Sequence, residues 1–360
     1  MPHAARLLYK RAYDRVNQEL RTAAGGRLAS LCRPTWISLL LTERCNSRCV
    51  HCDIWKNRGK EESSPTREQW QAVLSQLRRW LGPAHVCITG GEALLVPHTL
   101  DVVRHGVRLG LLLEVLSHGY WNDQTRIEGL ARANPWRITM SLDGLGEVHS
   151  RIRGRTGFAE RTLGSLETLL RLRESEGLSY SILLKTVVMR RNLAELAPIA
   201  RFAASRGVEV FYQPIEQNYG TREDPRWFDA SENWPDDPER AVSAVQELLA
   251  LKRSGLPIAN SEEQLEVMIP YFRDPAALRV ATQSHTAHGR RLTCSALSLL
   301  QIQANGDVKV CAATEPVGNV KEAPLRQIWA ERPRWWLQGC CLEHRLTDEE
   351  RLAASSPPSR

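Results

Sequence analysis

The residues with the clearest chemical potential are three cysteines, Cys45, Cys49 and Cys52, in the pattern C-x₃-C-x₂-C. Thiolates are soft ligands that suit iron–sulfur clusters, zinc or copper(I). Three thiolates leave one iron of a [4Fe–4S] cube without a protein ligand, so a substrate or cofactor could bind there. A structural zinc or cluster site is closed by a fourth ligand. The number of cysteines therefore favours a catalytic cluster.

Two other interpretations of this stretch stay open. Zinc could be held by the three cysteines with His51, although His51 and Cys52 are adjacent and would have to point at one ion. That site would make the protein a non-catalytic scaffold or sensor, as would an iron–sulfur cluster without a substrate. A disulfide network is less favoured, because the chain has nine cysteines, an odd number, and no apolar signal-peptide core precedes them.

A second motif, Gly90-Gly91-Glu92, directly follows the apolar segment 85–89, which is typical of a buried strand. Together with the cysteine spacing, this motif makes the chain resemble the radical S-adenosylmethionine (radical SAM) superfamily. In that family the glycines let the backbone come close to the methionine amino group of the cofactor, since glycine has no side chain. The family usually has proline next, whereas this chain has Ala93.

The resemblance implies both cofactors and a reaction. Cys45, Cys49 and Cys52 would hold a [4Fe–4S] cluster, and S-adenosylmethionine would chelate its open iron. One electron from a reduced flavodoxin or ferredoxin would cleave the cofactor to a 5′-deoxyadenosyl radical, which abstracts a hydrogen atom from the substrate. The hard chemistry then belongs to the cofactors, while the protein orients them and excludes water. His51 replaces the aromatic residue that packs near the adenine in the family.

Strand and helix patterns must position these motifs, and they alternate six times along the first part of the chain. The predicted strands are 36–41, 85–89, 111–117, 137–142, 180–189 and 208–214, and the predicted helices are 66–80, 97–108, 123–133, 158–176 and 193–206. This alternation predicts an α/β fold with a parallel sheet covered by helices. The pattern fits a doubly wound sheet or a TIM-like partial (β/α)₆ barrel, and the resemblance favours the barrel.

Polar residues gather at or near the carboxyl ends of the predicted strands, where ligands collect in both architectures. The resemblance implies that Ser141 and Asp143, in a Ser-x-Asp-Gly pattern, bind the cofactor ribose. Arg153 would meet the methionine carboxylate, because a guanidinium can pair two oxygens. For Ser141 and Asp143 the alternative is an ordinary turn and helix cap. The strand-end residues are Ser117, Ser141, Asp143, Lys185 and Gln213, of which we count Ser117 and Lys185 among the cofactor contacts.

A second cysteine group comprises Cys294, Cys311, Cys340 and Cys341. Two short strands, 299–304 and 308–312, flank Asn305-Gly306 and predict a β-hairpin that brings Cys294 and Cys311 together. The region resembles the SPASM and shorter twitch extensions of radical SAM proteins, which bind auxiliary iron–sulfur clusters. Four cysteines allow one further cluster. The adjacent pair leaves open which of the two binds, and a three-thiolate site or an extension without metal stays an alternative.

Size and charge limit the class of protein. The chain has 360 residues and a formal net charge of +7, without the concentrated basic stripe of nucleic-acid-binding proteins. No apolar run approaches the roughly 20 residues needed to cross a bilayer. We therefore expect a cytoplasmic protein, whose reducing setting keeps ligand thiols free.

Residues 5–22 predict an amphipathic helix, with Leu8, Ala12, Val16 and Leu20 on one face and arginines on the other. The favoured interpretation is that the apolar face packs on the outside of the barrel. The alternative is contact with a membrane surface or a partner.

The predicted substrate is a peptide or protein, or a small metabolite. Only about 34 residues precede the first strand, so we expect no built-in leader-binding domain there. An aromatic loop after residue 216 could form a lid or substrate wall. The predicted divisions are an N-terminal helix and lead-in (1–34), the barrel core (35–216), the aromatic loop and bridging helices (217–291), the extension (292–345) and a disordered tail (346–360).

Overall fold

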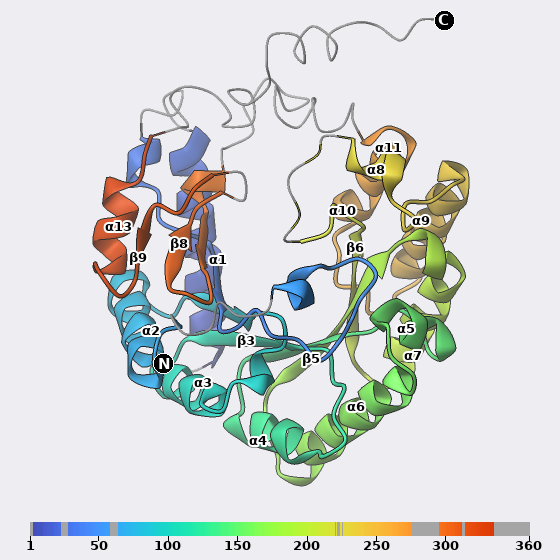
Figure 1. Cartoon of the computed structure of the whole chain (residues 1–360), viewed down its shortest axis with the longest axis horizontal. Helices are drawn as coiled ribbons and strands as arrows, with labels where there is room; N and C mark the ends of the chain where they lie inside the picture. Colours follow the sequence, from blue (N-terminus) through green and yellow to red (C-terminus); the bar gives the residue numbers. More distant parts are fainter. Residues whose placement is uncertain are drawn as a thin grey trace, which may run out of the picture.

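The computed structural model describes residues 3–22, 28–57, 64–219, 221, 224, 226–275, 295–311 and 314–334. Its centre is a nine-stranded sheet in the order β6-β5-β4-β3-β2-β1-β7-β8-β9, curved into an incomplete barrel (Figure 1). The first six strands run parallel in sequence order, which confirms the predicted α/β partial barrel. They are β1 (Trp36–Leu40), β2 (His85–Thr89), β3 (Leu112–Ser117), β4 (Arg137–Ser141), β5 (Ser181–Val188) and β6 (Glu209–Pro214).

Helices cover the outer face of this sheet, because alternate strand residues are apolar and buried. In β2, for example, Val86 and Ile88 join the main core, while His85, Cys87 and Thr89 point to the inner face. The covering helices are α2 (Arg67–Leu81), α3 (Thr99–Arg108), α4 (Thr125–Ala133), α6 (Phe158–Ser175) and α7 (Leu196–Ser205). A short helix, α5 (Glu147–Arg153), was not predicted and precedes α6.

The extension continues the barrel sheet. Strand β7 (Leu299–Ile302) pairs in parallel with β1, and β8 (Asp307–Lys309) returns antiparallel to β7, as the hairpin prediction required. Gly306 occupies the left-handed region at the turn, with φ of 91°. Beyond β9 (Gly318–Asn319), helix α13 (Leu325–Glu331) packs near α2, and its Trp329 indole donates to the Cys32 carbonyl at 2.8 Å.

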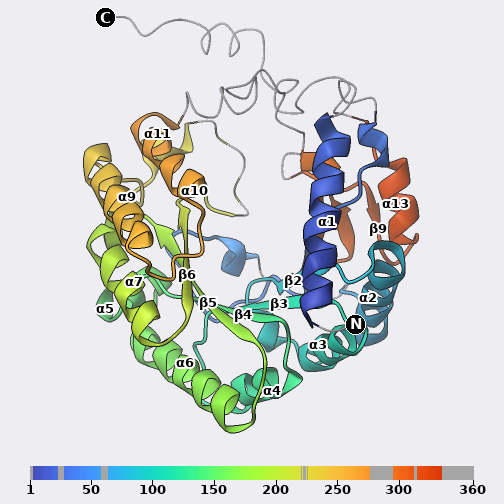
Figure 2. The ribbon, with the colours of Figure 1, turned by 180° about the vertical axis from the view of Figure 1, so that it is seen from behind.

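Helix α1 (His3–Thr22) lies along the β1–β7 side of the molecule (Figure 2), but the predicted packing face is wrong. The side chains of Leu8 and Val16 are 64% and 58% exposed. The helix instead docks through tyrosines, since Tyr9 donates its hydroxyl to the Leu81 carbonyl at 3.0 Å and Tyr13 to the Pro34 carbonyl at 2.8 Å. The pattern of aliphatic residues therefore predicted the wrong face, because the hydrogen bonds of Tyr9 and Tyr13 determine which face of the helix docks.

The segment after β6 is held by aromatic packing. The Trp234 ring lies 5.5 Å from the ring of Trp227 and 5.4 Å from that of Tyr271, which places the loop against helix α11 (Met268–Arg273). Two further helices, α9 (Pro238–Arg253) and α10 (Glu262–Glu266), complete this side. None of the helices in the described ranges is long and apolar enough to cross a membrane.

Candidate active site

The three cysteines of the first motif lie in the loop that leaves the carboxyl end of β1. Their thiols are close enough to influence one another's ionisation. Burial, reinforced by the neighbouring Cys49 thiol, raises the pKa of Cys45 to about 12 and that of Cys52 to about 11. A bound metal would have to offset this cost, because a coordinating thiol is held as the thiolate. Without such a cation, these thiols stay protonated at neutral pH.

Helix α5 anchors the cysteine loop through the main chain. The Arg48 amide donates to the Arg153 carbonyl at 3.0 Å, and the Val50 amide donates to the Ile152 carbonyl at 2.9 Å. Gly154 follows with φ of 69°, and a Cβ there would lie 2.3 Å from the Arg48 carbonyl oxygen. Glycine is thus required for this approach, both for its conformation and for its missing side chain.

The Gly90-Gly91-Glu92 segment contacts the same loop from the side of β2. The Gly91 amide donates to the Thr42 carbonyl and the Glu92 amide to the Arg44 carbonyl, both at 2.8 Å. A Cβ on Gly90 would lie 2.4 Å from the Thr42 oxygen, and one on Gly91 would lie 2.3 Å from the Arg44 oxygen. The two glycines therefore allow the protein's own backbone at Thr42 and Arg44 to come close. The prediction from the sequence gave a different reason, the approach of the cofactor.

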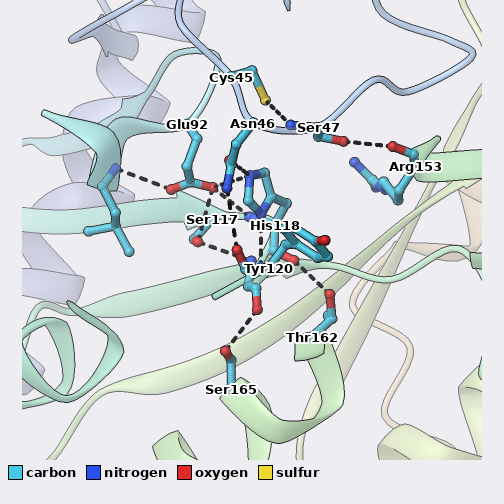
Figure 3. A network of polar contacts seen from close by, with 12 residues as sticks. Cys45, Asn46, Ser47, Glu92, Ser117, His118, Tyr120, Arg153, Thr162 and Ser165 are labelled. Carbon is cyan, nitrogen blue, oxygen red and sulfur yellow. Dashed lines mark hydrogen bonds and ion pairs between the residues drawn. The ribbon is translucent and has the colours of Figure 1, made fainter. Parts of the chain in front are cut away.

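Glu92 is buried and receives three hydrogen bonds. Its Oε1 accepts from the Leu94 amide at 3.1 Å, while its Oε2 accepts from the Ser117 hydroxyl at 3.1 Å and the His118 amide at 2.9 Å (Figure 3). Burial raises the pKa of Glu92 to about 7, and the hydrogen bonds oppose that rise. Ser117, predicted as a cofactor contact, is engaged here in holding this carboxylate.

His118 connects the β3 end to the cysteine loop. Its Nδ1 accepts from the Tyr120 amide at 2.9 Å, so the ring proton belongs on Nε2, which donates to the Asn46 Oδ1 at 2.7 Å (Figure 3). Burial lowers the pKa of His118 to about 3, which keeps the ring neutral. No role was predicted for Asn46 or His118, and the only signal in the sequence was that His118 directly follows a predicted strand.

Arg153 and Asp143 form a buried ion pair beside Cys49. The Arg153 Nη2 lies 2.6 Å from the Asp143 Oδ2, and the Arg153 Nη1 donates to the Cys49 Sγ at 3.5 Å. The other Asp143 oxygen accepts from the Val187 amide at 2.9 Å. Burial acts to raise the pKa of Asp143, but Arg153 outweighs it and the pKa lies below its ordinary value. Both predicted cofactor contacts are thus already paired with each other, and their predicted roles stay predictions.

Two further predicted contacts lie on the inner face of the sheet. Ser141 and Lys185 are register partners on β4 and β5, and both side chains are half-buried. Gln213, near the end of β6, pairs in register with Val187 and is also half-buried. The structure therefore brings these groups to the same face of the sheet as the inward residues of β2, as the strand-end argument predicted.

Several buried nitrogens near the ion pair have no hydrogen-bond partner among the described residues. They are the His51 Nδ1, the His149 Nε2 and the Arg153 Nε. Burial lowers the pKa of His51 to about 4 and that of His149 to about 3, so both rings are neutral. Since buried polar groups are normally paired, these atoms mark a place that a polar ligand would complete. The donors present therefore fit a buried cluster with a polar cofactor.

The described residues do not fit a single-ion site. Within the ranges that the structure describes, no three Cys, His, Asp or Glu side chains converge on one position suitable for a metal ion. A mononuclear zinc site needs that convergence. Cluster thiolates each bind a different iron, so they need not meet at a point.

The predicted auxiliary site is described in part. Cys311 follows β8 and is buried, with 7% of its surface exposed. Cys294, Cys340 and Cys341 lie outside the described residues. Among the predicted auxiliary ligands, Cys311 alone lies within the described residues, and the ligand set of a second cluster stays a prediction.

Comparison with known protein families decides the identity. The model of the radical SAM superfamily matches residues 39–203, and that of an iron–sulfur cluster-binding domain, SPASM, matches residues 294–349. The chain is a radical SAM enzyme with a SPASM extension. Its cofactors are accordingly a [4Fe–4S] cluster and S-adenosylmethionine, its SPASM domain is of a kind that binds additional iron–sulfur clusters, and it requires a reductant.

Relatives of this radical SAM enzyme act on different substrates. The chain is 24% identical over 299 residues to the AdoMet-dependent heme synthase of Methanosarcina barkeri, covering 82% of each. It is 30% identical over 183 residues to the sporulation killing factor maturation protein SkfB of Bacillus subtilis, covering 49% of this chain and 42% of SkfB. Streptococcus suis SuiB bound to its precursor peptide SuiA has the same fold, with a TM-score of 0.61 at 14% identity, over 90% of this chain and 69% of SuiB.

Proposed function

We propose that the enzyme holds its [4Fe–4S] cluster through Cys45, Cys49 and Cys52, and that its product is formed after hydrogen abstraction from a substrate carbon. The single observation that carries this assignment is the loop of three free thiols, with Cys49 buried and Cys45 and Cys52 partly exposed, that is fixed between the Gly90–Glu92 segment and α5. When bound and reduced, the cluster supplies the electron that cleaves S-adenosylmethionine to the 5′-deoxyadenosyl radical.

The protein's own residues bind and orient these groups. The backbone and carboxylate of Gly90-Gly91-Glu92 offer hydrogen-bond acceptors suited to the cofactor amino group. Ser141 and Lys185 face the inner side of the sheet, where a hydroxyl and an ammonium suit the ribose and a carboxylate. The neutral His51 ring offers a flat surface and an unpaired nitrogen for the adenine. These roles, and the domain boundaries predicted from the sequence, belong to this proposal.

A peptide or protein is the first candidate substrate. The maturation protein SkfB and SuiB, whose structure holds its precursor peptide, share sequence or fold with this chain. A small metabolite is the second candidate, favoured by the match to the heme synthase over 82% of both chains. Formation of 5′-deoxyadenosine, measured with peptide and metabolite pools offered separately, distinguishes the classes; stimulation by metabolites alone rejects the peptide candidate.

The electron donor we propose is a reduced flavodoxin or ferredoxin of the cytoplasm. Such a donor must reach the cysteine loop region, which lies at the carboxyl edge of the sheet. Replacing chemical reductant with reduced flavodoxin or ferredoxin should sustain cofactor cleavage. If neither protein supports cleavage while dithionite does, this choice of donor is wrong.

The exposed face of α1 suits an anionic membrane surface. Leu8 and Val16 are exposed aliphatic residues, and Arg11 and Arg15 are exposed on the same helix. Aliphatic side chains can enter the headgroup region while arginines attract anionic lipid. We expect cosedimentation with vesicles containing phosphatidylserine to fall in Leu8→Asp/Val16→Asp and to persist in the control Val267→Asp, which alters an exposed valine elsewhere. Equal binding by all three proteins contradicts this contact.

Iron content tests the cluster assignment directly. Anaerobically reconstituted protein is expected to hold about eight irons if both clusters form, falling to about four in a Cys45/Cys49/Cys52 triple-alanine variant. If about four irons are found and none remain in the variant, the cluster at the three cysteines is supported and a second cluster is not. Electron paramagnetic resonance identifies the cluster type in each case. Zinc in place of iron after anaerobic purification would overturn the proposed function.

A further inference from the structure

Arg153 is a charged side chain that the structure places in contact with a proposed cluster ligand, Cys49. Its guanidinium donates to the Cys49 sulfur at 3.5 Å and pairs with the Asp143 carboxylate at 2.6 Å. We propose that Arg153 is a positioning residue that raises the reduction potential of the cluster by donating a charged hydrogen bond to Cys49. This inference rests on the proposed function, because it takes Cys49 as a cluster ligand.

The orientation of the guanidinium is fixed from its far side. Asp143 is fully buried and the Arg153 side chain is 8% exposed, so water competes little for either group. Asp143 is in turn held by the Val187 amide at 2.9 Å, and its own amide donates to the His149 Nδ1 at 3.0 Å. The ion pair is therefore attached to β5 and to the start of α5, which leaves the Nη1 pointing at Cys49.

Other donors reach the same cysteine loop, but they are uncharged. The Ser47 hydroxyl lies 2.9 Å from the Cys49 sulfur and 3.0 Å from the Arg153 carbonyl, and the Ser47 amide donates to the Cys45 sulfur at 3.4 Å. A single hydroxyl proton can serve the sulfur or the carbonyl, not both at full strength. Among the described residues, Arg153 is thus the cationic donor that contacts one of these three sulfurs.

The physical consequence concerns the reduced cluster. Reduction adds one negative charge, which spreads partly onto the thiolate sulfurs. A neighbouring cation and a hydrogen bond to sulfur stabilise that charge more than the oxidised form, and burial strengthens the effect. Arg153 should therefore make the cluster easier to reduce. Asp143 opposes part of this effect, since its carboxylate is nearby, while keeping the guanidinium in place.

The backbone and side chain of Arg153 can be separated by mutation. The loop is anchored through the Arg153 and Ile152 carbonyls, which every residue possesses. Replacing the side chain therefore leaves the anchoring hydrogen bonds. A purely structural role for Arg153 predicts that a variant binds less cluster, and that the cluster which remains has the wild-type reduction potential. The cluster potential distinguishes the two roles.

The test is a redox titration followed by electron paramagnetic resonance on reconstituted full-length protein, without substrate. At the potential where the wild-type cluster at Cys45, Cys49 and Cys52 is half reduced, we expect the ratio of reduced to oxidised cluster in Arg153→Gln to fall about tenfold, or about 59 mV for one electron. In Arg153→Lys the ratio of reduced to oxidised cluster should fall less, because lysine keeps the positive charge but not the planar guanidinium. Arg201→Gln, which breaks an exposed ion pair with Glu247, should match the wild type.

Each outcome decides the inference. An unchanged potential in Arg153→Gln with full iron content overturns it. If Arg153→Gln loses the cluster, the variants Asp143→Asn and Arg153→Lys provide the test. The cluster is expected to be easier to reduce in Asp143→Asn and harder to reduce in Arg153→Lys. An unchanged reduction potential in both variants overturns the inference. Wild-type protein that binds no cluster at the three cysteines instead refutes the proposed function, which is thereby distinguished from failure of this inference.

Discussion

Replacement of Cys49 by alanine is expected to reduce reductive cleavage of S-adenosylmethionine to the uncatalysed background. The proposed cluster has three protein ligands, and the remaining two cannot retain it with an iron open for the cofactor. Cys49 is buried and receives contacts from Ser47 and Arg153, which hold its sulfur in place within the loop. Formation of 5′-deoxyadenosine under dithionite, together with iron content, measures the loss.

Cys32 provides the matched control for this prediction. It is also buried, but its sulfur donates to the Asn17 carbonyl at 3.7 Å beside α1. Cys32→Ala should lose about 1 kcal/mol of folding free energy through the small cavity and retain cofactor cleavage. Wild-type cleavage by Cys49→Ala would show that the cluster is not held as proposed. Loss in both variants would point to general damage to the fold.

The parallel α/β sheet was predicted from local signals, whereas the choice of a partial barrel over a doubly wound sheet came from the family resemblance. Alternating apolar strands and amphipathic helices specify a parallel sheet, and the hairpin around Asn305-Gly306 is set by a glycine that accepts a positive φ. The parallel pairing of β7 with β1 was not predicted, since it joins segments about 260 residues apart and depends on which sheet edge is free. The face of α1 was wrong for a related reason, because tyrosine hydrogen bonds to distant carbonyls fix it.

The candidate site divides in the same way. Cysteine spacing and the glycine motif are short patterns, and they identified the loop that the structure places at the end of β1. The partners of that loop came from elsewhere in the chain: His118 reaches Asn46 across 72 positions, and Arg153 reaches Cys49 across 104. The patterns that predict helices and strands do not predict contacts between residues so far apart in the chain. Arg153 was singled out by resemblance, and its predicted contact with the cofactor stays a prediction. Its pairing with Asp143 depends on the fold and was not predicted.

Substitution of Gly91 by alanine is expected to disrupt the cysteine loop. The new Cβ would lie 2.3 Å from the Arg44 carbonyl oxygen and 2.8 Å from that of Glu43, and both are backbone atoms that cannot rotate away. Relief requires the two segments to separate, which breaks the 2.8 Å hydrogen bonds from Gly91 to Thr42 and from Glu92 to Arg44. We expect a loss of about 2–4 kcal/mol in the free energy of unfolding, measured with denaturant, and weaker cluster binding.

Gly164 supplies the control, because it lies inside α6 and a Cβ there would meet nothing within 4 Å. Gly164→Ala should stabilise the protein by up to about 1 kcal/mol, since alanine favours the helix, and leave iron content unchanged. The two glycine-to-alanine substitutions are thus expected to change the free energy of unfolding in opposite directions. This difference separates the effect of a steric clash from that of reduced chain flexibility. A Gly91→Ala protein with wild-type stability and iron content would mean that the cysteine loop and the β2 end do not approach closely enough for a Cβ on residue 91 to clash.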